Sequence, residues 1–408
     1  MPRGRPYNRA QRRDFPRRSS VNPDPKTLIA QVGPYPPEKN GIGDYVSDLV
    51  HALSERDPGV SNLVLACRIP GAPEREPGVW RCWDPHSNWP DELLRAVDEA
   101  RPRLVHIQHG MYMGHGGRVE RFLDGLRSRR IPGVVTLHGV WPETLVRRWP
   151  RRFHRALGTS AARIVIHQGA GSMAVLLAHG VLAERIVIIP LGTRPAPAID
   201  HGQARRELGL PDGRLALFAG LIFRRKGLHT VIRAFEGVAR DVPGARLLAV
   251  GRERMAQPLD WAYRTWLHRL ARRGRTSGWL DFRPGHVSEE ELSLAIAAAD
   301  AVVFPYLRPY GSSSAMLHRV LAAGRPAVCS RVPTFAEASE AWGKDLPELI
   351  VPPGDVESWR RSLRALFSRD DLLARAAAAS ARLGRANPLT AMADAHLRLY
   401  RALLAPGA

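Results

Sequence analysis

Short apolar runs alternate with amphipathic stretches along most of the chain, and this alternation predicts its secondary structure. Before residue 194 the runs typical of strands are Leu28–Val32, Leu63–Cys67, Leu104–Ile107, Val134–Leu137, Ile164–His167 and Ile186–Pro190. Apolar residues at helical spacing occur between them, for example over Tyr45–Ser54 and Arg118–Arg127. Strands that alternate with helices in this way are typical of βαβ units and a parallel sheet.

A Pro-rich stretch interrupts this pattern, and a second set of strands and helices follows it. The interruption is Thr193–Asp200, which reads TRPAPAID and suits a linker. The strands predicted after it are Leu215–Ala219, Ala245–Val250, Trp279–Phe282, Ala301–Phe304, Ala327–Cys329 and Leu349–Val351. Helical stretches such as Leu228–Val238 and Glu289–Ala299 separate these strands. The pattern therefore predicts two successive α/β domains, for which 408 residues are sufficient.

Composition and pattern together divide the chain into five parts. Residues 1–25 carry seven arginines and almost no apolar content, so we expect a disordered basic arm there. The first domain is predicted over 26–193, a linker over 194–204 and the second domain over 205–385. Residues 386–408 are predicted to form a C-terminal helix, which can pack on the second domain or cross back to the first.

The chain is strongly basic, which the apolar pattern does not show. Its formal net charge is +21. Only four of the 60 basic residues are lysines, so codon composition can explain part of the arginine excess. A positive field attracts phosphates, anionic lipid or nucleic acid, and charge alone does not choose among them. No basic cluster interleaved with stacking aromatics and no RNA-binding motif occurs, so we expect no nucleic-acid partner.

The apolar stretches also bear on location. No run approaches the roughly 18 to 20 apolar residues of a membrane-spanning helix, and no signal-peptide segment follows the basic N-terminus. Cys67, Cys82 and Cys329 are far apart and show no CxxC pairing. We therefore expect a cytoplasmic protein. The basic stretch Thr144–Leu157 carries an aromatic stripe, which can lie on anionic lipid at the inner face of the membrane or can face the core.

Three segments between a predicted strand and a predicted helix are candidates for binding an anion. Gly41–Gly43 would let the backbone approach a ligand at a helix N-terminus, although a plain tight turn explains it equally well. Arg224–Lys226 places three cations where a strand ends, which suits a diphosphate. Tyr310–Ser314 reads YGSSS, and its serines can cradle an anion, cap the next helix, or both.

Several histidines lie at the ends of predicted strands, and we retain His138, which Gly139 follows, as a site residue. None of these histidines has the helical spacing or cysteine neighbours that would indicate a metal site. We therefore expect neither a metal nor another cofactor.

These segments, in this order, resemble glycosyltransferase family 4, whose members are retaining enzymes with the GT-B fold. The resemblance covers roughly residues 27 to 400. In the first half it rests on PPEKNGIGDY at 36–45, VVTLH at 134–138 and IPLG at 189–192. In the second half it rests on KGL at 226–228, ADAVVFP at 299–305, AGRP at 323–326 and VPPGD at 351–355.

The resemblance implies a GT-B architecture, in which two Rossmann-like, doubly wound domains face each other across a cleft. The first domain would hold the acceptor and the second the nucleotide sugar. Lys226 would neutralise the pyrophosphate and His138 would line the sugar pocket, without a metal. The candidate donor-binding residues are Gly41, Ile42, Gly43, His138, Arg224, Arg225, Lys226, Ser312, Ser313, Ser314 and Arg319.

Three positions depart from the family pattern. Members commonly carry two glutamates eight positions apart, one meeting the donor sugar and one the ribose hydroxyls, and here these positions are Gly311 and Arg319. The arginine often found five residues before the pyrophosphate lysine is Leu221. Ser312–Ser314 and the arginines before Lys226 can supply a rearranged donor site.

We therefore expect a hexosyltransferase-like, retaining enzyme that moves a sugar from a nucleotide donor to a glycan, a glycolipid or a small molecule. The acceptor can be lipid-linked, which would agree with a peripheral position on the membrane. The alternative is a catalytically degenerate GT-B protein that binds or scaffolds another glycosyltransferase. Neither interpretation assigns a catalytic general base, the nucleotide base or the sugar.

Overall fold

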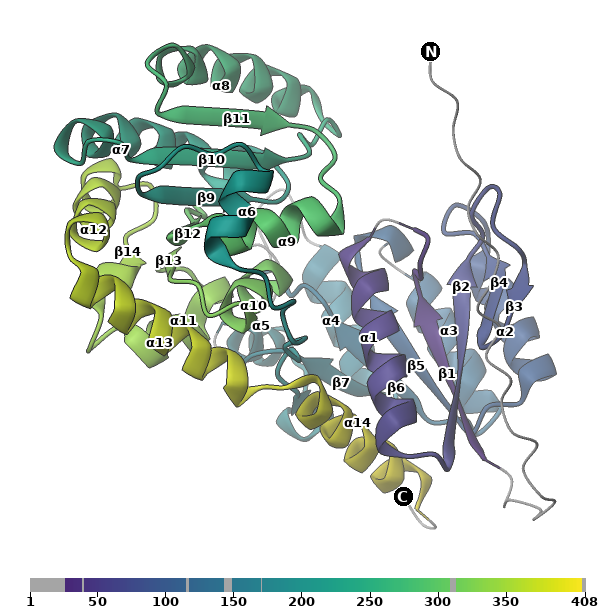
Figure 1. The fold of residues 1–408 in the computed structure, drawn as a ribbon. Helices are drawn as coiled ribbons and strands as arrows, with labels where there is room; N and C mark the ends of the chain where they lie inside the picture. The colour runs from purple at the N-terminus through teal and green to yellow at the C-terminus, as the bar shows by residue number, and fades with distance from the viewer. Residues whose placement is uncertain are drawn as a thin grey trace, which may run out of the picture.

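The chain forms two α/β domains that lie side by side, each built around a sheet with helices packed against it (Figure 1). The computed structural model describes residues 26–38, 40–114, 117–142, 149–169, 171–308 and 313–405. The predicted basic arm of residues 1–25 lies outside these ranges.

Within the described residues, the first domain holds an eight-stranded sheet with β1 near its middle. Across the sheet the strands are β3 (Arg75–Glu76), β4 (Val79–Trp83), β2 (Val60–Cys67), β1 (Thr27–Gly33), β5 (Leu104–His109), β6 (Gly133–Leu137), β7 (Arg163–Ile166) and β8 (Ile186–Ile188). Neighbours are parallel except β3 and β4. Strand order reverses between β1 and β5, and ligands bind at such reversals in doubly wound sheets.

The described part of the second domain holds a six-stranded sheet in which every neighbouring pair is parallel. Its strands, in spatial order, are β11 (Leu280–Pro284), β10 (Arg246–Gly251), β9 (Leu215–Ala219), β12 (Ala301–Phe304), β13 (Ala327–Ser330) and β14 (Ile350–Val351). Strand order reverses here between β9 and β12, as it does between β1 and β5.

Helices bury both faces of the first sheet, because successive strand residues point to opposite sides. On β1, Ala30 belongs to one buried cluster and Ile29 to another. The helices of this domain are α1 (Gly41–Arg56), α2 (Trp89–Ala100), α3 (Gly117–Ser128), α4 (Trp149–Thr159) and α5 (Ser172–Ala178). Those of the second domain are α6 (His201–Glu207), α7 (Leu228–Asp241), α8 (Pro258–Thr276), α9 (Glu289–Ala298), α10 (Ala315–Ala322), α11 (Ala336–Trp342), α12 (Val356–Ser368) and α13 (Asp370–Ala386).

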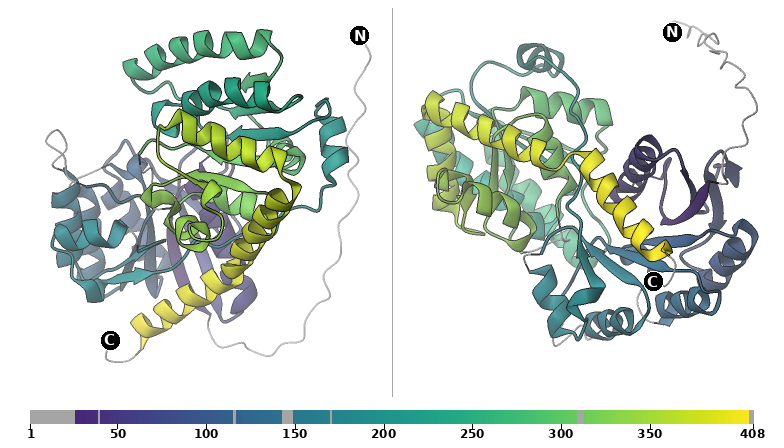
Figure 2. Two further views of the ribbon diagram at one scale, coloured as in Figure 1. Left: turned by 90° about the vertical axis from the view of Figure 1, so that its left-hand side faces the viewer. Right: turned by 90° about the horizontal axis from the view of Figure 1, so that it is seen from below.

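The last helix, α14 (Leu389–Leu404), crosses back from the second domain to the first. Figure 2 shows α13 and α14 following each other across both domains. Leu397 and Tyr400 of α14 are buried in the same cluster as Val46 and Leu49 of α1. Of the two predicted placements for the C-terminal helix, the return to the first domain is therefore confirmed.

The basic stretch that we considered as a membrane face is described from Trp149 onward, as α4. Phe153 and Leu157 are buried in the core of the first domain. The apolar stripe of α4 therefore faces the core, as one of the two interpretations predicted. In the part of the chain that the structure describes, no helix combines the length and apolar content needed to cross a membrane.

Candidate functional site

Two segments meet at the carboxyl edge of the second sheet. The 3-10 turn Arg224–Lys226 follows β9, and Pro305–Leu307 follows β12. The amide of Leu307 donates a hydrogen bond to the carbonyl oxygen of Arg225 at 2.8 Å. Because β9 and β12 are neighbours where strand order reverses, the predicted cationic turn lies where ligands enter sheets of this kind.

Gly227 allows this close approach of the two segments. Its φ angle is +70°, which disfavours residues with a side chain. A Cβ atom at this position would lie 1.8 Å from the carbonyl oxygen of Pro305. The glycine after the three cations is therefore required by the packing of the cationic turn against the β12 loop.

The ammonium of Lys226 lies against Tyr306, a residue that the sequence did not single out. Its Nζ is 3.8 Å from the centre of the Tyr306 ring and also donates a hydrogen bond to the phenolic oxygen. Burial lowers the pKa of Lys226 from 10.5 to about 7. A cation that has lost much of its water is well suited to bind an anionic ligand.

The serine loop follows β12 on the same edge of the sheet. Ser314 is buried and caps α10, because its Oγ accepts a hydrogen bond from the amide of Leu317 at 3.3 Å. Ser313 is partly buried beside it, whereas Ser312 lies outside the described residues. The predicted capping role is therefore confirmed for Ser314. Ser313 and Ser314 follow the same strand, β12, as Tyr306.

On the first domain, Gly41, Ile42 and Gly43 form the first turn of α1, after β1. The side chain of Asn40 accepts a hydrogen bond from the amide of Ile42 at 3.0 Å. A Cβ at Gly110, after β5, would lie 2.6 Å from Ile42 Cδ1. The predicted glycine turn therefore lies over the point where strand order reverses between β1 and β5. One of the free amides at the start of α1, that of Ile42, is already capped by Asn40.

His138 is part of a chain of polar side chains at the ends of β5, β6 and β7. Its Nε2 lies 3.1 Å from Gln108 Oε1, and its Nδ1 lies 3.3 Å from Nε2 of His167. The ring of Tyr45 stands at 4.8 Å from the His138 ring in an edge contact. Burial lowers the pKa of His138 well below its usual 6.5, so the ring is neutral at neutral pH.

The two domains meet through buried polar contacts near these edges. Thr193 Oγ1 lies 3.0 Å from His318 Nδ1 on α10. The other ring nitrogen of His318 lies 2.9 Å from a carboxylate oxygen of Glu337 on α11. Across the boundary, His167 of the first domain is close to His318 and Glu337, and burial lowers the pKa of His167 to about 4. The carboxyl edges of the two sheets therefore face each other.

Two family models match consecutive parts of the chain. A model described as "Glycosyl transferase 4-like domain" matches residues 40–192, and one described as "Glycosyl transferases group 1" matches residues 213–369. The chain belongs to the family 4-like glycosyltransferases. No curated protein matches the sequence of this glycosyltransferase.

Solved structures share the fold of this glycosyltransferase at low identity. A glycosyltransferase from Rickettsia africae has a TM-score of 0.72 and 12% identity over 94% of this chain and 100% of its own. Sucrose-phosphate synthase from Thermosynechococcus elongatus has a TM-score of 0.71 and 19% identity, over 93% and 99%. HepE from Anabaena, in complex with UDP, has a TM-score of 0.70 and 13% identity, over 92% and 100%. The predicted GT-B architecture is confirmed.

In this glycosyltransferase the second family glutamate position holds Arg319, whose guanidinium pairs with Glu289 of α9. The charge of Arg319 also acts on Asp44 in the first turn of α1. Burial raises the pKa of Asp44, and the arginine opposes that rise. Gly311, at the first glutamate position, lies outside the described residues. Arg319 therefore lies at the boundary between the domains, facing acidic groups on both.

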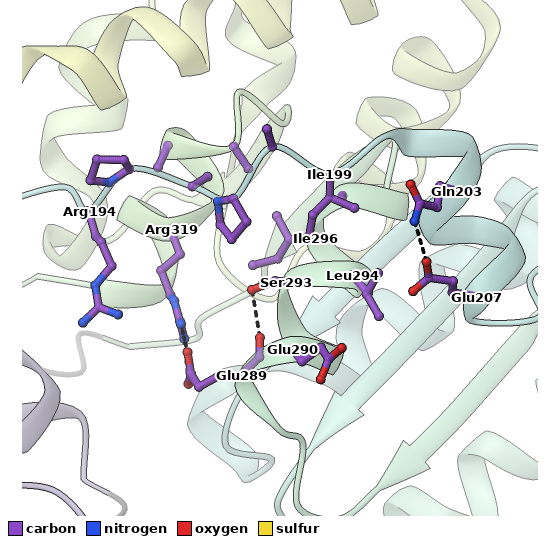
Figure 3. Close-up of a pocket in the computed structure, with 17 residues that line it drawn as sticks. Arg194, Ile199, Gln203, Glu207, Glu289, Glu290, Ser293, Leu294, Ile296 and Arg319 are labelled. Atoms are coloured by element: carbon purple, nitrogen blue, oxygen red, sulfur yellow. Dashed lines mark hydrogen bonds and ion pairs between the residues drawn. The ribbon is translucent and has the colours of Figure 1, made fainter. Parts of the chain in front are cut away.

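Arg319 also borders a cavity of about 580 Å³ beside the linker (Figure 3). The linker, α6, α9 and α10 form its walls. Lys226, Ser314 and His138 do not line this cavity. Figure 3 shows the Arg319 side chain directed toward Glu289. Among the predicted donor residues of the second domain, the fold thus separates those on the β9–β12 edge from Arg319 beside the linker cavity.

Proposed function

We propose that this glycosyltransferase takes a hexosyl group from a nucleoside-diphosphate sugar and transfers it with retention of configuration. The observation that carries the proposal is the desolvated ammonium of Lys226 at the reversal between β9 and β12. Solved HepE structures of the same fold contain UDP and UDP-glucose, which supports a nucleotide donor here.

In this proposal Lys226 neutralises the diphosphate as it leaves the sugar. A cation already held in place by Tyr306 requires little reorganisation when negative charge develops. This positive charge takes the role that a metal ion has in other transferases, so we propose a reaction without a metal or other cofactor. Neutral His138 would bind a sugar hydroxyl by giving up one of its two hydrogen bonds, to Gln108 or to His167.

The missing glutamates require other groups to hold the ribose and the sugar. We assign these contacts to Ser313, Ser314 and the arginines Arg224 and Arg225, which follow β9 and β12. The acceptor would be a glycan, a lipid-linked sugar or a small molecule held by the first domain. We propose a cytoplasmic enzyme that lies peripherally at the inner face of the membrane, which the net charge of +21 favours.

One observation favours the alternative of a degenerate scaffold. Arg319 stands where a ribose-binding carboxylate is expected and is engaged by Glu289. A protein that has lost donor binding can keep the fold and bind another glycosyltransferase through it. The two proposals differ in whether a nucleoside diphosphate binds the second domain.

Calorimetric titration of the purified protein with UDP, GDP and ADP tests the proposal. We expect one nucleotide to bind, and Lys226→Ala to weaken that binding at least about tenfold, as loss of a charge-assisted contact should. Lys344→Ala is the matched control, because Lys344 is exposed. Absence of binding to all three nucleotides by a folded protein would favour the scaffold.

A further inference from the structure

Helix α8 presents apolar side chains to solvent on the outer edge of the second domain. Leu259 is 77% exposed, Trp261 57% and Trp266 38%. The opposite side of the helix is anchored, because Leu267 and Ala271 are buried in the domain core. Leu259 and Trp261 lie in the first turn of the helix, whereas the partly exposed Trp266 also contacts the rings of His229 and Tyr263.

The same helix is strongly basic on its exposed side. Arg269, Arg272 and Arg275 are exposed, and in the described part of the chain no carboxylate pairs with them. The acidic group within the helix, Asp260, is buried and bound by Arg254 at 3.0 Å. The exposed side of α8 therefore carries positive charge that the protein itself leaves uncompensated.

The acidic groups beside α8 are already engaged. Glu253 binds Arg264 at 2.8 Å and His268 at 2.7 Å. Glu236 of the neighbouring α7 binds Arg273 at 3.0 Å. Neither carboxylate is thus available to neutralise the arginines that remain on the exposed side, so that side is complementary to an anionic surface.

We propose that the exposed side of α8 docks this glycosyltransferase on an anionic lipid bilayer. Trp261 and Trp266 would lie at the headgroup level, which indole rings prefer, and Leu259 would enter the acyl boundary. Arg269 and Arg272 would bind lipid phosphates. A soluble anionic glycan would also attract arginines and stack on indole, but it offers no favourable environment for an exposed leucine.

The position of α8 in the fold would bring the opening between the domains close to the membrane. The helix follows β10, whose carboxyl end lies on the edge that carries Lys226, so the N-terminal end of α8 begins at that edge (Figure 1). Docking through Leu259 and Trp261 would bring the opening between the domains close to the bilayer. A lipid-linked acceptor could then reach the donor, a step that rests on the proposed function.

Vesicle sedimentation of the full chain tests the docking surface. Vesicles of phosphatidylcholine alone are compared with vesicles that contain about 30% phosphatidylglycerol, at low salt and at physiological salt. The charge variant is Arg269→Gln with Arg272→Gln, and the apolar variant is Leu259→Ser with Trp261→Ala. The matched control is Arg152→Gln with Arg155→Gln, which removes two exposed arginines from α4.

We expect binding to the anionic vesicles alone, and a fall of at least about tenfold in each α8 variant, given the contribution of each arginine near an anionic surface. The control should change binding less than about twofold. Equal binding by wild type and both α8 variants would overturn the proposal, as would no binding of the wild type. So would α8 variants that keep vesicle binding but lose binding to heparin, which would assign the surface to a glycan.

Nucleotide titration of the same variants separates this proposal from the proposed function. If the α8 variants bind nucleotide like the wild type and lose the vesicles, the docking proposal is supported. A wild type that binds vesicles through α8 but binds no nucleotide would support docking and contradict the proposed transfer.

Discussion

Lys226 combines a cationic side chain with a site that disfavours the charge. The Tyr306 ring and phenol contact the ammonium, while burial brings its pKa down to about 7. Near neutral pH the residue is therefore close to losing its proton in the free protein. A bound diphosphate would restore the proton, because an opposite charge nearby favours the ammonium form.

Nucleotide binding should therefore weaken as pH rises from 7 to 9. Above about pH 7 the free protein loses the Lys226 proton and must regain it on binding, so the dissociation constant should rise up to about tenfold per pH unit. Calorimetry in buffers of different ionisation enthalpy would show the proton uptake. Lys226→Arg, which stays charged, should bind with little change over this range. An unchanged affinity in the wild type would contradict the assignment.

At the scale of elements, α14 is fixed to the first domain by Tyr400. Its hydroxyl lies 2.6 Å from Nδ1 of His106 in β5 and accepts a hydrogen bond from Gln31 of β1 at 3.2 Å. His106 also reaches Thr136 of β6 at 2.7 Å. One hydroxyl thus joins the returning helix to the central strands of the sheet.

Removing that hydroxyl should destabilise the fold more than removing a surface ion pair of the same helix. Tyr400→Phe leaves buried groups of His106 and Gln31 without this partner, and we expect a loss of about 1–3 kcal/mol in the free energy of unfolding. Arg401→Ala, which removes the exposed pair with Asp57, should cost less than about 1 kcal/mol. Urea denaturation measures both. Equal losses would mean that the buried network does not hold α14.

At the scale of the whole molecule, the candidate donor residues belong to two bodies. The α1 turn and His138 lie on the first domain, whereas Lys226 and the serine loop lie on the second. Between the domains, Arg194 of the linker pairs with Asp48 of α1, and Thr193 contacts His318. Ligand contacts from both sides would therefore favour an arrangement in which the domains approach each other.

Small-angle scattering should show this closure as a smaller radius of gyration when the bound nucleotide is present at saturation. Closure requires contacts from both domains to one ligand, and Lys226→Ala removes the main contact from the second domain. At the same nucleotide concentration this variant should therefore keep the radius of gyration of the nucleotide-free protein. A radius of gyration that does not change at saturation would count against closure.

Much of the fold could be predicted because the deciding signals are local. Alternation of apolar runs and helical stretches predicted twelve strand positions, and the C-terminal helix predicted over 386–408 contains α14 (Leu389–Leu404). The strand β4 was not predicted because Arg81 interrupts its apolar residues, so its sequence VWRCW shows neither a continuous apolar run nor an alternating pattern. Arg81 is tolerated there because it binds Glu76 at 2.5 Å and the carbonyl oxygen of Pro36 at 2.6 Å.

By itself the sequence determined the two-domain α/β class, the family resemblance and the cations after β9, because these depend on residues close together in the chain. Only the tertiary structure decided that α14 returns to the first domain, and that Tyr306 lies on Lys226. It also decided that α4 faces the core while α8 exposes its tryptophans. The physical reason is that burial and desolvation are set by neighbours far apart in sequence, which local periodicity does not specify.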